Sequence, residues 1–235
     1  MLQILPFIII VVAGIGYAIN RNKLTVPAAI TGAAVATLLF VGAGYVGFVM
    51  MTLFFMLGTL ATSHKKNIKK QLGIAEENKG RRTIGQVLAN AGVAGLSALL
   101  MLMDAQHKEL YLLMIASAFS SATADTISSE LGSVYGSKFY NILTFKKDQR
   151  GLNGVVSLEG TLAGVLGSIM IALVFVCFQQ FDNRFIVIVV AGTVGNIMDS
   201  LLGATLENRQ VIGNNAVNFL NTISAAITAG LLMQM

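Results

Sequence analysis

Three carboxylates, Asp125, Glu130 and Asp199, lie within or at the ends of long apolar stretches of the sequence. Asp125 and Asp199 are each followed directly by a hydroxyl residue. Ionisable groups at membrane depth are costly, so their presence favours a functional role. In phosphate chemistry, Mg²⁺ is commonly held by one or two carboxylates together with the substrate phosphates. We therefore predict that these three carboxylates are the catalytic residues and the ligands of a magnesium ion.

The two carboxylates of the first acidic segment need a particular helix geometry to share one site. Asp125 and Glu130 are five residues apart, which is about 140° around a helix. They meet if the helix ends or unwinds near Gly132, and glycine is a common helix terminator. The alternative is a structural role, in which each carboxylate pairs with a basic loop residue such as Lys138.

Cationic residues gather in two polar segments, 63–83 and 129–154. The predicted phosphate ligands in these segments are Lys79, Arg81, Arg82, Lys146 and Lys147. The second segment ends in a turn whose glycines allow backbone N–H groups to point at one anion. We therefore add Gly151, Asn153 and Gly154 to the predicted phosphate-binding residues. The alternative for the lysines is an ordinary cytoplasmic loop that contacts anionic lipid head groups.

Two polar stripes continue into apolar segments. Asn214, Asn218 and Asn221 follow helical spacing, so they share one helix face and could orient an acceptor phosphate or a nucleobase. Gln86 and Asn90 continue a similar stripe from the preceding basic segment. Hydrogen bonding between helices is the alternative use of such residues. Besides the three asparagines, the polar residues that we expect to face the site are Gln86, Asn90, Ser129, Ser157, Glu159 and Ser200.

The composition predicts the scaffold that must position these residues. The chain has 235 residues, of which 55% are hydrophobic and 11% charged, whereas soluble domains carry roughly 25% charged residues. Such a chain is typical of an integral membrane protein. In lipid, a helix forms all the hydrogen bonds of its backbone N–H and C=O groups internally. We predict an all-α polytopic transmembrane helix bundle that forms a single domain over residues 1–235. Cys177 is the sole cysteine, which excludes an intrachain disulfide.

The apolar stretches predict about eight membrane spans, because a helix needs about 20 apolar residues to cross the hydrocarbon core. The predicted spans are 2–19, 26–43, 45–62, 84–102, 111–128, 155–178, 185–204 and 212–233. The glycines near residue 44 separate the second span from the third. All but two of the 16 Lys and Arg residues fall in loops on one side of this topology. The positive-inside rule places that side in the cytoplasm and the N-terminus outside.

Five sequence blocks identify a family resemblance. They are KGRRTIGQVLAN (79–90), SATADTISSELG (121–132), GLNGVVSLEGT (151–161), DSLLGAT (199–205) and NNAVNF (214–219). In this order they resemble the polytopic membrane family that includes the plastid phytyl-phosphate kinase of the vitamin E pathway. The resemblance covers residues 55–230. The chain departs from the family pattern at Gln149-Arg150, where a proline is expected, and at Glu207, where glutamine is more usual.

The resemblance implies a kinase that phosphorylates an isoprenoid (prenyl or phytyl) monophosphate to its diphosphate. The family is distantly similar to phytol and dolichol kinases and to phosphatidate cytidylyltransferases, which implies CTP as the phosphoryl donor and Mg²⁺ as the cofactor. A phosphate monoester is already an anionic nucleophile, so phosphoryl transfer here needs positioning and charge neutralisation more than a general base.

Two other functions fit the same residues. A cytidylyltransferase would use the same donor and metal but transfer CMP to a lipid phosphate. A cation or lipid transporter would use acidic residues in a polar bundle, although transporters place such groups near the midplane. The expected partners are a nucleoside triphosphate, an isoprenoid monophosphate and the lipid bilayer, without nucleic acid; homo-oligomer formation stays open. We expect the cytoplasmic membrane of a prokaryote, with the active site facing the cytoplasm.

Overall fold

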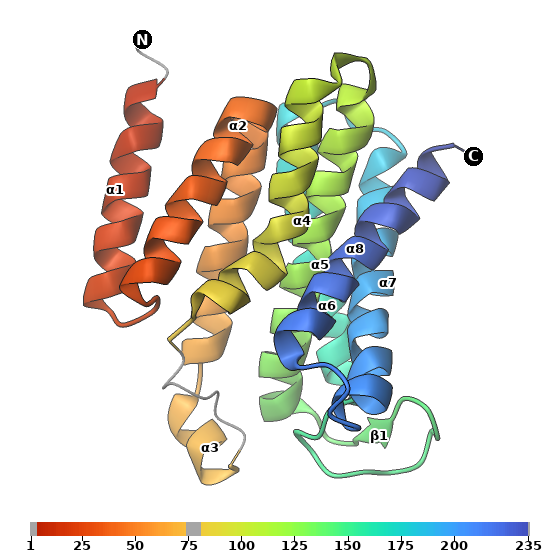
Figure 1. The fold of residues 1–235 in the computed structure, drawn as a ribbon. Coiled ribbons are helices and arrows are strands. Elements are labelled where there is room, and N and C mark those ends of the chain that lie inside the picture. The colour runs from red at the N-terminus through yellow and green to blue at the C-terminus, as the bar shows by residue number, and fades with distance from the viewer. Residues whose placement is uncertain (1–3, 74–80, 235) are drawn as a thin grey trace.

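The computed structural model describes residues 4–73 and 81–234, and the described chain is a bundle of helices (Figure 1). The helices are α1 (Ile4–Asn20), α2 (Val26–Ser63), α3 (Lys66–Gln71), α4 (Ile84–Met103), α5 (Lys108–Tyr135), α6 (Leu158–Phe178), α7 (Arg184–Leu202) and α8 (Asn214–Met233). Among the described residues, six helices are long and apolar enough to cross a membrane: α2 and α4 to α8. The prediction of an all-α polytopic bundle is therefore confirmed.

Helix α2 is a hairpin of two helical halves. Its 38 residues would extend about 57 Å if straight, nearly twice the roughly 30 Å hydrocarbon thickness of a bilayer. The backbone instead leaves helical geometry at Gly44, where φ is +64° and ψ is −152°, a conformation that glycine adopts at low cost. Figure 1 shows the chain reversing between the two halves. The predicted break between 26–43 and 45–62 thus lies where the chain turns, while the count of eight membrane spans stays a prediction.

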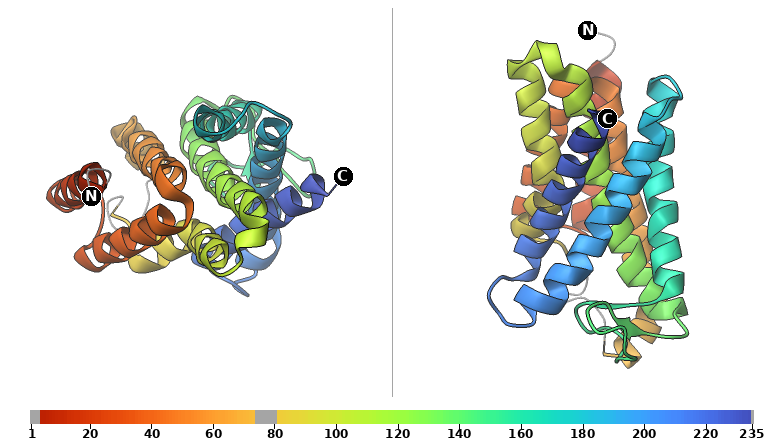
Figure 2. Two further views of the ribbon diagram at one scale, coloured as in Figure 1. Left: turned by 90° about the horizontal axis from the view of Figure 1, so that it is seen from above. Right: turned by 90° about the vertical axis from the view of Figure 1, so that its right-hand side faces the viewer.

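Helix α5 is the centre of the bundle. It packs against α2, α4, α6, α7 and α8, and half of its 28 residues are buried. Small residues let its neighbours approach closely, as is common between membrane helices. A side chain at Gly192 or Gly195 would collide with the hydroxyl of Ser120 or Ser121 on α5. Helix α1 lies at the edge of the bundle beside α2 (Figure 2).

Helix α5 continues through Gly132, so the helix end that would bring Glu130 beside Asp125 is not found there. It continues to Tyr135, and Gly136 provides its C-terminal cap. Gly132 is a packing residue, because a Cβ there would lie 2.8 Å from the Cα of Gly160 in α6. A close helix crossing explains this glycine, so it does not terminate the helix.

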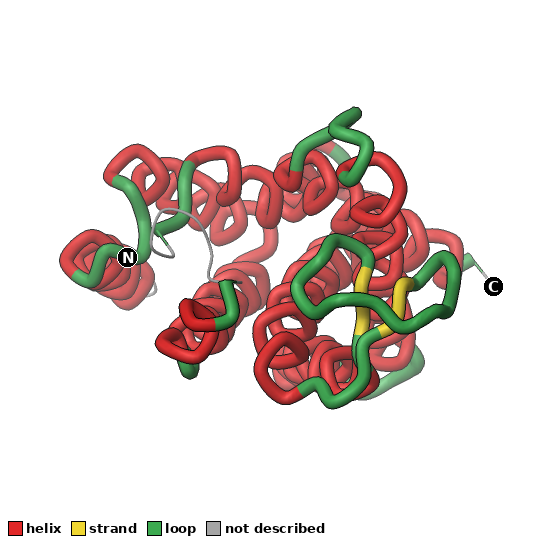
Figure 3. The backbone as a smooth tube through the Cα atoms, turned by 90° about the horizontal axis from the view of Figure 1, so that it is seen from below, coloured by secondary structure: helices red, strands yellow, loops and turns green. Residues whose placement is uncertain are grey.

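Loops that carry predicted site residues lie at one end of the bundle, opposite the start of α1 and the end of α8 (Figure 1). Helix α3, the 136–157 segment and the 203–213 segment all lie there (Figures 1 and 3). The 136–157 segment contains a short antiparallel ladder of β1 (Tyr140–Asn141) and β2 (Val155–Val156). At the end of α7, η3 (Gly203–Glu207) is one turn of π-helix. The predicted grouping of the motif loops agrees with this arrangement, while the cytoplasmic location of this end stays a prediction.

Candidate active site

A polar cavity of about 250 Å³ opens at the loop-bearing end, between α4, α5, α7, α8 and the 151–157 turn. Most of the predicted site residues line it: Arg82, Gln86, Asn90, Asp125, Ser129, Glu130, Gly151, Asn153, Gly154, Ser157, Asp199, Ser200, Asn214 and Asn218. Residues from five distant parts of the sequence therefore meet in one cavity.

The carboxyl groups of Asp125 and Asp199 lie within hydrogen-bonding distance of each other. The two residues come from α5 and α7, which pack side by side. Two carboxylates in contact repel each other unless a proton or a cation lies between them. A pair of carboxylates next to space for phosphates is the donor set that Mg²⁺ uses in phosphate chemistry. Among the described residues, no group of three or more His, Cys, Asp or Glu side chains that could hold a metal ion is found. The magnesium site at Asp125 and Asp199 therefore stays a prediction.

Asn221 forms a hydrogen bond to one member of this pair from outside the cavity. Its side-chain Nδ2 donates a 2.8 Å hydrogen bond to Asp199 Oδ1. Its Oδ1 accepts a 3.0 Å hydrogen bond from the hydroxyl of Ser121. Asn221 is fully buried and does not line the cavity. It was predicted as a phosphate or nucleobase ligand, but the structure places it behind the carboxylates.

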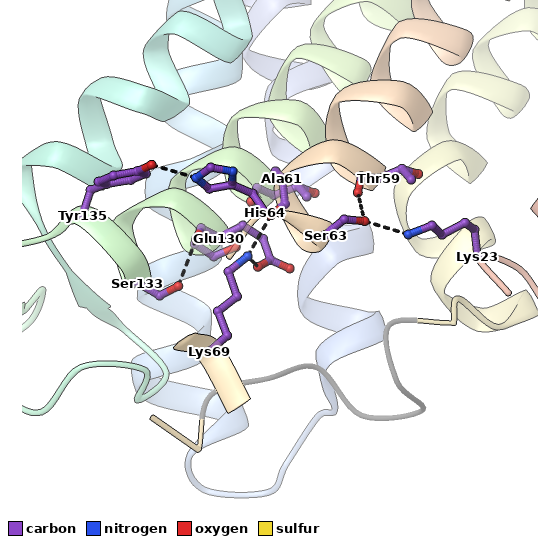
Figure 4. A network of polar contacts seen from close by, with 11 residues as sticks. Lys23, Thr59, Ala61, Ser63, His64, Lys69, Glu130, Ser133 and Tyr135 are labelled. Atoms are coloured by element: carbon purple, nitrogen blue, oxygen red, sulfur yellow. Dashed lines mark hydrogen bonds and ion pairs between the residues drawn. The ribbon is translucent and has the colours of Figure 1, made fainter. Parts of the chain in front are cut away.

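Glu130 lines the same cavity but has a different partner. Its carboxylate forms an ion pair with Lys69 of α3 (Figure 4). Lys69 is only 2% exposed, and its Nζ also donates a 2.7 Å hydrogen bond to the carbonyl of Ala61. This ion pair joins α3 to α5 at the rim of the cavity. The role of Glu130 as a metal ligand stays a prediction.

The two arginines before α4 have different environments. Arg82 lines the cavity, and its guanidinium lies over the Phe54 ring, 5.3 Å from the centroid. The guanidinium also fills the space above Gly58, where a Cβ would lie 2.5 Å from it. The Arg81 Nε donates a 3.2 Å hydrogen bond to the carbonyl of Leu24, and Arg81 does not line the cavity. The phosphate-binding role predicted for both arginines therefore fits Arg82 better.

The glycine turn closes the cavity from the loop side. Gly151 and Gly154 have φ values of +83° and +76°, so both adopt the left-handed region that glycine favours. Gly154 packs against η3, since a Cβ there would lie 2.2 Å from the Cβ of Ala204. The Asn208 side chain donates a 3.2 Å hydrogen bond to the carbonyl of Asn153, which fixes the turn against the end of α7.

Three other predicted residues do not line the cavity. Lys146 and Lys147 are exposed on the loop, and they do not line the cavity. Glu159 accepts a 3.1 Å hydrogen bond from the backbone N–H of Ser137, so it stabilises the loop after α5. Lys79 lies outside the described residues.

Several cavity residues were not predicted from the sequence: Thr126, Ser128, Ser133, Phe139, Asn196 and Glu207. Asn196 lies three residues before Asp199, so helical spacing could have placed both on one face. Glu207 interacts with Asp199 and with the side chain of Asn214. Its departure from the family pattern was the signal that pointed to this position.

Comparison with known proteins agrees with the resemblance predicted from the five sequence blocks. The chain is 35% identical over 199 residues to Protein VTE6, chloroplastic, of Arabidopsis thaliana, a match that covers 81% of this chain and 60% of that protein. The chain thus spans less than two thirds of the length of that relative. It is 33% identical over 193 residues to Uncharacterized membrane protein MJ0933 of Methanocaldococcus jannaschii, covering 80% of this chain and 77% of the relative.

A third relative, Protein PGR of Arabidopsis thaliana, is 27% identical over 212 residues, covering 80% of this chain and 73% of the relative. No solved structure matches the chain. Residues 9–226 match the family described as integral membrane protein DUF92. The chain therefore belongs to the DUF92 family of integral membrane proteins.

Proposed function

We propose that this protein is a membrane-embedded kinase that transfers a phosphoryl group from a nucleoside triphosphate to an isoprenoid monophosphate, giving the diphosphate. We further propose CTP as the donor. The observation that carries the proposal is the contact between Asp125 and Asp199 in a polar cavity that also contains Arg82 and the glycine turn. The resemblance of the five sequence blocks to the family that includes the phytyl-phosphate kinase supports the same reaction class, and the 35% identity to Protein VTE6 supports the family assignment.

Each group of cavity residues has a role in this reaction. Asp125 and Asp199 would hold Mg²⁺, which neutralises charge on the donor phosphates when bound. The guanidinium of Arg82 binds phosphate oxygens as a planar, permanently charged donor. We expect the backbone N–H groups between Gly151 and Gly154 to bind a second set of phosphate oxygens. The amides of Asn214 and Asn218 also line the cavity, and we expect them to orient the acceptor phosphate or the nucleobase.

The membrane setting suits an amphiphilic acceptor. The cavity lies at one end of an apolar bundle, so a phosphate can enter from the aqueous side while its tail stays among the helices. By the positive-inside rule this end faces the cytoplasm, where nucleotides are available. We propose a prokaryotic cytoplasmic membrane as the location.

The test is a transfer assay with purified protein in lipid nanodiscs. Isoprenoid monophosphates of several lengths are incubated with Mg²⁺ and with CTP labelled at either the α- or the γ-phosphate, and then with ATP, GTP and UTP. A kinase transfers only the γ-label and yields the isoprenoid diphosphate. Transfer of the α-label would instead identify a cytidylyltransferase. Absence of transfer from every nucleotide would contradict both reactions. Equal transfer by the Asp199→Asn variant and the wild type would contradict the assigned site.

A further inference from the structure

A second cavity, of about 140 Å³, lies between α1, α2 and α4 and is almost entirely apolar. Small residues create much of its space, among them Gly14 and Ala18 of α1 and Gly32 and Ala36 of α2. At Gly14 and Gly32 an added Cβ would meet no other atom within 4 Å. The small residues therefore leave space between these helices that larger side chains would fill.

The apolar cavity adjoins the polar cavity at two shared residues. Arg82 and Gln86 line both cavities. Arg82 reaches this junction because the preceding loop is fixed: its N–H donates a 2.9 Å hydrogen bond to the carbonyl of Lys23, and its carbonyl accepts a 3.0 Å bond from Thr25. These bonds tie the start of α4 to the loop between α1 and α2. A cationic group thus lies at the boundary between a polar and an apolar compartment.

Another apolar cavity, between α2, α5 and α6, is less suitable. It is lined by residues such as Leu60, Tyr135 and Leu166. In the part of the chain that the structure describes, it shares no lining residue with the polar cavity. A ligand with its phosphate beside Asp125 and Asp199 would therefore extend its tail toward α1 instead.

We propose that the cavity between α1, α2 and α4 binds the hydrocarbon tail of the acceptor, with the acceptor phosphate at Arg82. The inference rests on the proposed function, because it takes an isoprenoid monophosphate as the substrate. Its basis is the shared position of Arg82, which matches a ligand with one charged end and one apolar end. The peripheral helix α1 becomes a wall of the substrate site and contributes to selection of tail length.

Substitutions that fill the cavity test this assignment. Gly32→Leu and Gly14→Leu place a side chain in the apolar cavity without an initial clash of the Cβ. Gly16→Leu is the matched control, because Gly16 lies on the same helix as Gly14, has open space around an added Cβ, and does not line the cavity. We expect the KM for geranylgeranyl monophosphate to rise about tenfold or more in the two cavity variants, in line with the sensitivity of apolar pockets to small changes of shape.

The result for a short substrate separates tail binding from general damage. The KM for dimethylallyl monophosphate should change less than about twofold in the same variants, with kcat unchanged for both substrates, since uniform binding affects KM alone. Equal KM values for geranylgeranyl monophosphate in Gly32→Leu and Gly16→Leu would overturn the proposal and indicate a groove filled by bilayer lipid. In that outcome the wild type still transfers phosphate, so the proposed function stands.

A binding measurement tests the site even if no transfer occurs. A geranylgeranyl monophosphate carrying a diazirine in its tail is photolysed with the full protein in nanodiscs, and the labelled peptides are identified by mass spectrometry. Labelling of α1 and the first half of α2, reduced in Gly32→Leu but not in Gly16→Leu, supports the proposal. Labelling around Tyr135 and α6, unchanged in Gly32→Leu, would show that the tail binds in the other apolar cavity.

Discussion

The side-chain amide of Asn221 bridges α7 and α5, donating a hydrogen bond of 2.8 Å to Asp199 and accepting one of 3.0 Å from Ser121. Asn221 itself belongs to α8, so one buried side chain connects three helices. The bond engages Asp199 Oδ1, and Asp199 also interacts with Asp125. The orientation of the carboxylate pair is therefore set by a residue outside the cavity.

Loss of this bridge should impair catalysis without removing a ligand. In Asn221→Ala, Asp199 loses its amide partner and Ser121 its acceptor, which should lower the stability by about 1–3 kcal/mol. We expect kcat to fall at least tenfold with little change in the KM of the acceptor. Steady-state kinetics and thermal unfolding in detergent measure both effects. Ser224→Ala is the control on the same helix, because its hydroxyl bonds the carbonyl of Leu220; an equal loss in that variant would contradict a specific role for Asn221.

The pattern of apolar residues predicted the helices well. The bounds of the predicted segments 84–102 and 155–178 agree with those of α4 and α6 to within a few residues. An uninterrupted apolar segment of this length can adopt few structures other than a helix in a membrane. The role of Gly132 near the end of α5 could not be decided from the sequence, because this glycine has two possible uses. A glycine that ends a helix and a glycine that permits a close crossing look alike in the sequence, and only the position of Gly160 distinguishes them.

The candidate site was predictable in its residue types but not in its pairings. Spacing placed Asp125 and Asp199 at one membrane face, and the structure brings them into contact. The partner of Glu130 could not be read from the sequence, because Lys69 lies on a short helix 61 residues away. The different environments of Arg81 and Arg82 depend on the bonds to the 23–25 loop, which no local pattern reveals.

The carboxylate pair should behave as one functional unit. Asp125→Asn and Asp199→Asn preserve side-chain shape and remove one charge each, so each should abolish phosphoryl transfer. The double variant should be no less active than either single variant, because either loss destroys the same site. Transfer assays over a Mg²⁺ titration, with detergent unfolding as a folding check, measure this. Substantial activity in one single variant, or a double variant far worse than both, would indicate two independent roles.

The two adjacent arginines should differ in their effects on substrate binding. Arg82→Ala should raise the KM for the acceptor monophosphate by at least about tenfold, consistent with loss of a charged hydrogen bond. Arg82→Lys should recover part of the loss, since a lysine keeps the charge but not the planar geometry. Arg81→Ala should change the KM less than threefold, because Arg81 bonds the carbonyl of Leu24 away from the cavity. The reverse order in the measured KM values would contradict this assignment.

Gly154 should be intolerant of any side chain. Gly154→Ala requires a left-handed φ of +76° and brings its Cβ within 2.2 Å of Ala204, so the turn must move away from η3. We expect loss of activity together with a destabilisation of at least about 1 kcal/mol. Gly213→Ala serves as the control, because that glycine has a φ of −96° and an added Cβ would have no atom within 4 Å. Thermal unfolding and the transfer assay should show near wild-type behaviour for the control alone.

The ion pair of Lys69 and Glu130 permits a direct test of whether Glu130 has a catalytic role. Both side chains are largely buried, so removing one partner, as in Lys69→Met, should lower stability by about 3–5 kcal/mol. The double variant Lys69→Met with Glu130→Leu should recover most of that stability, because replacing both charges by apolar groups leaves neither unpaired. Its activity then decides the role of the carboxylate. If Glu130 is a metal ligand, the stable double variant should stay inactive at every Mg²⁺ concentration; activity near the wild-type level would instead show that the pair only holds α3 against α5.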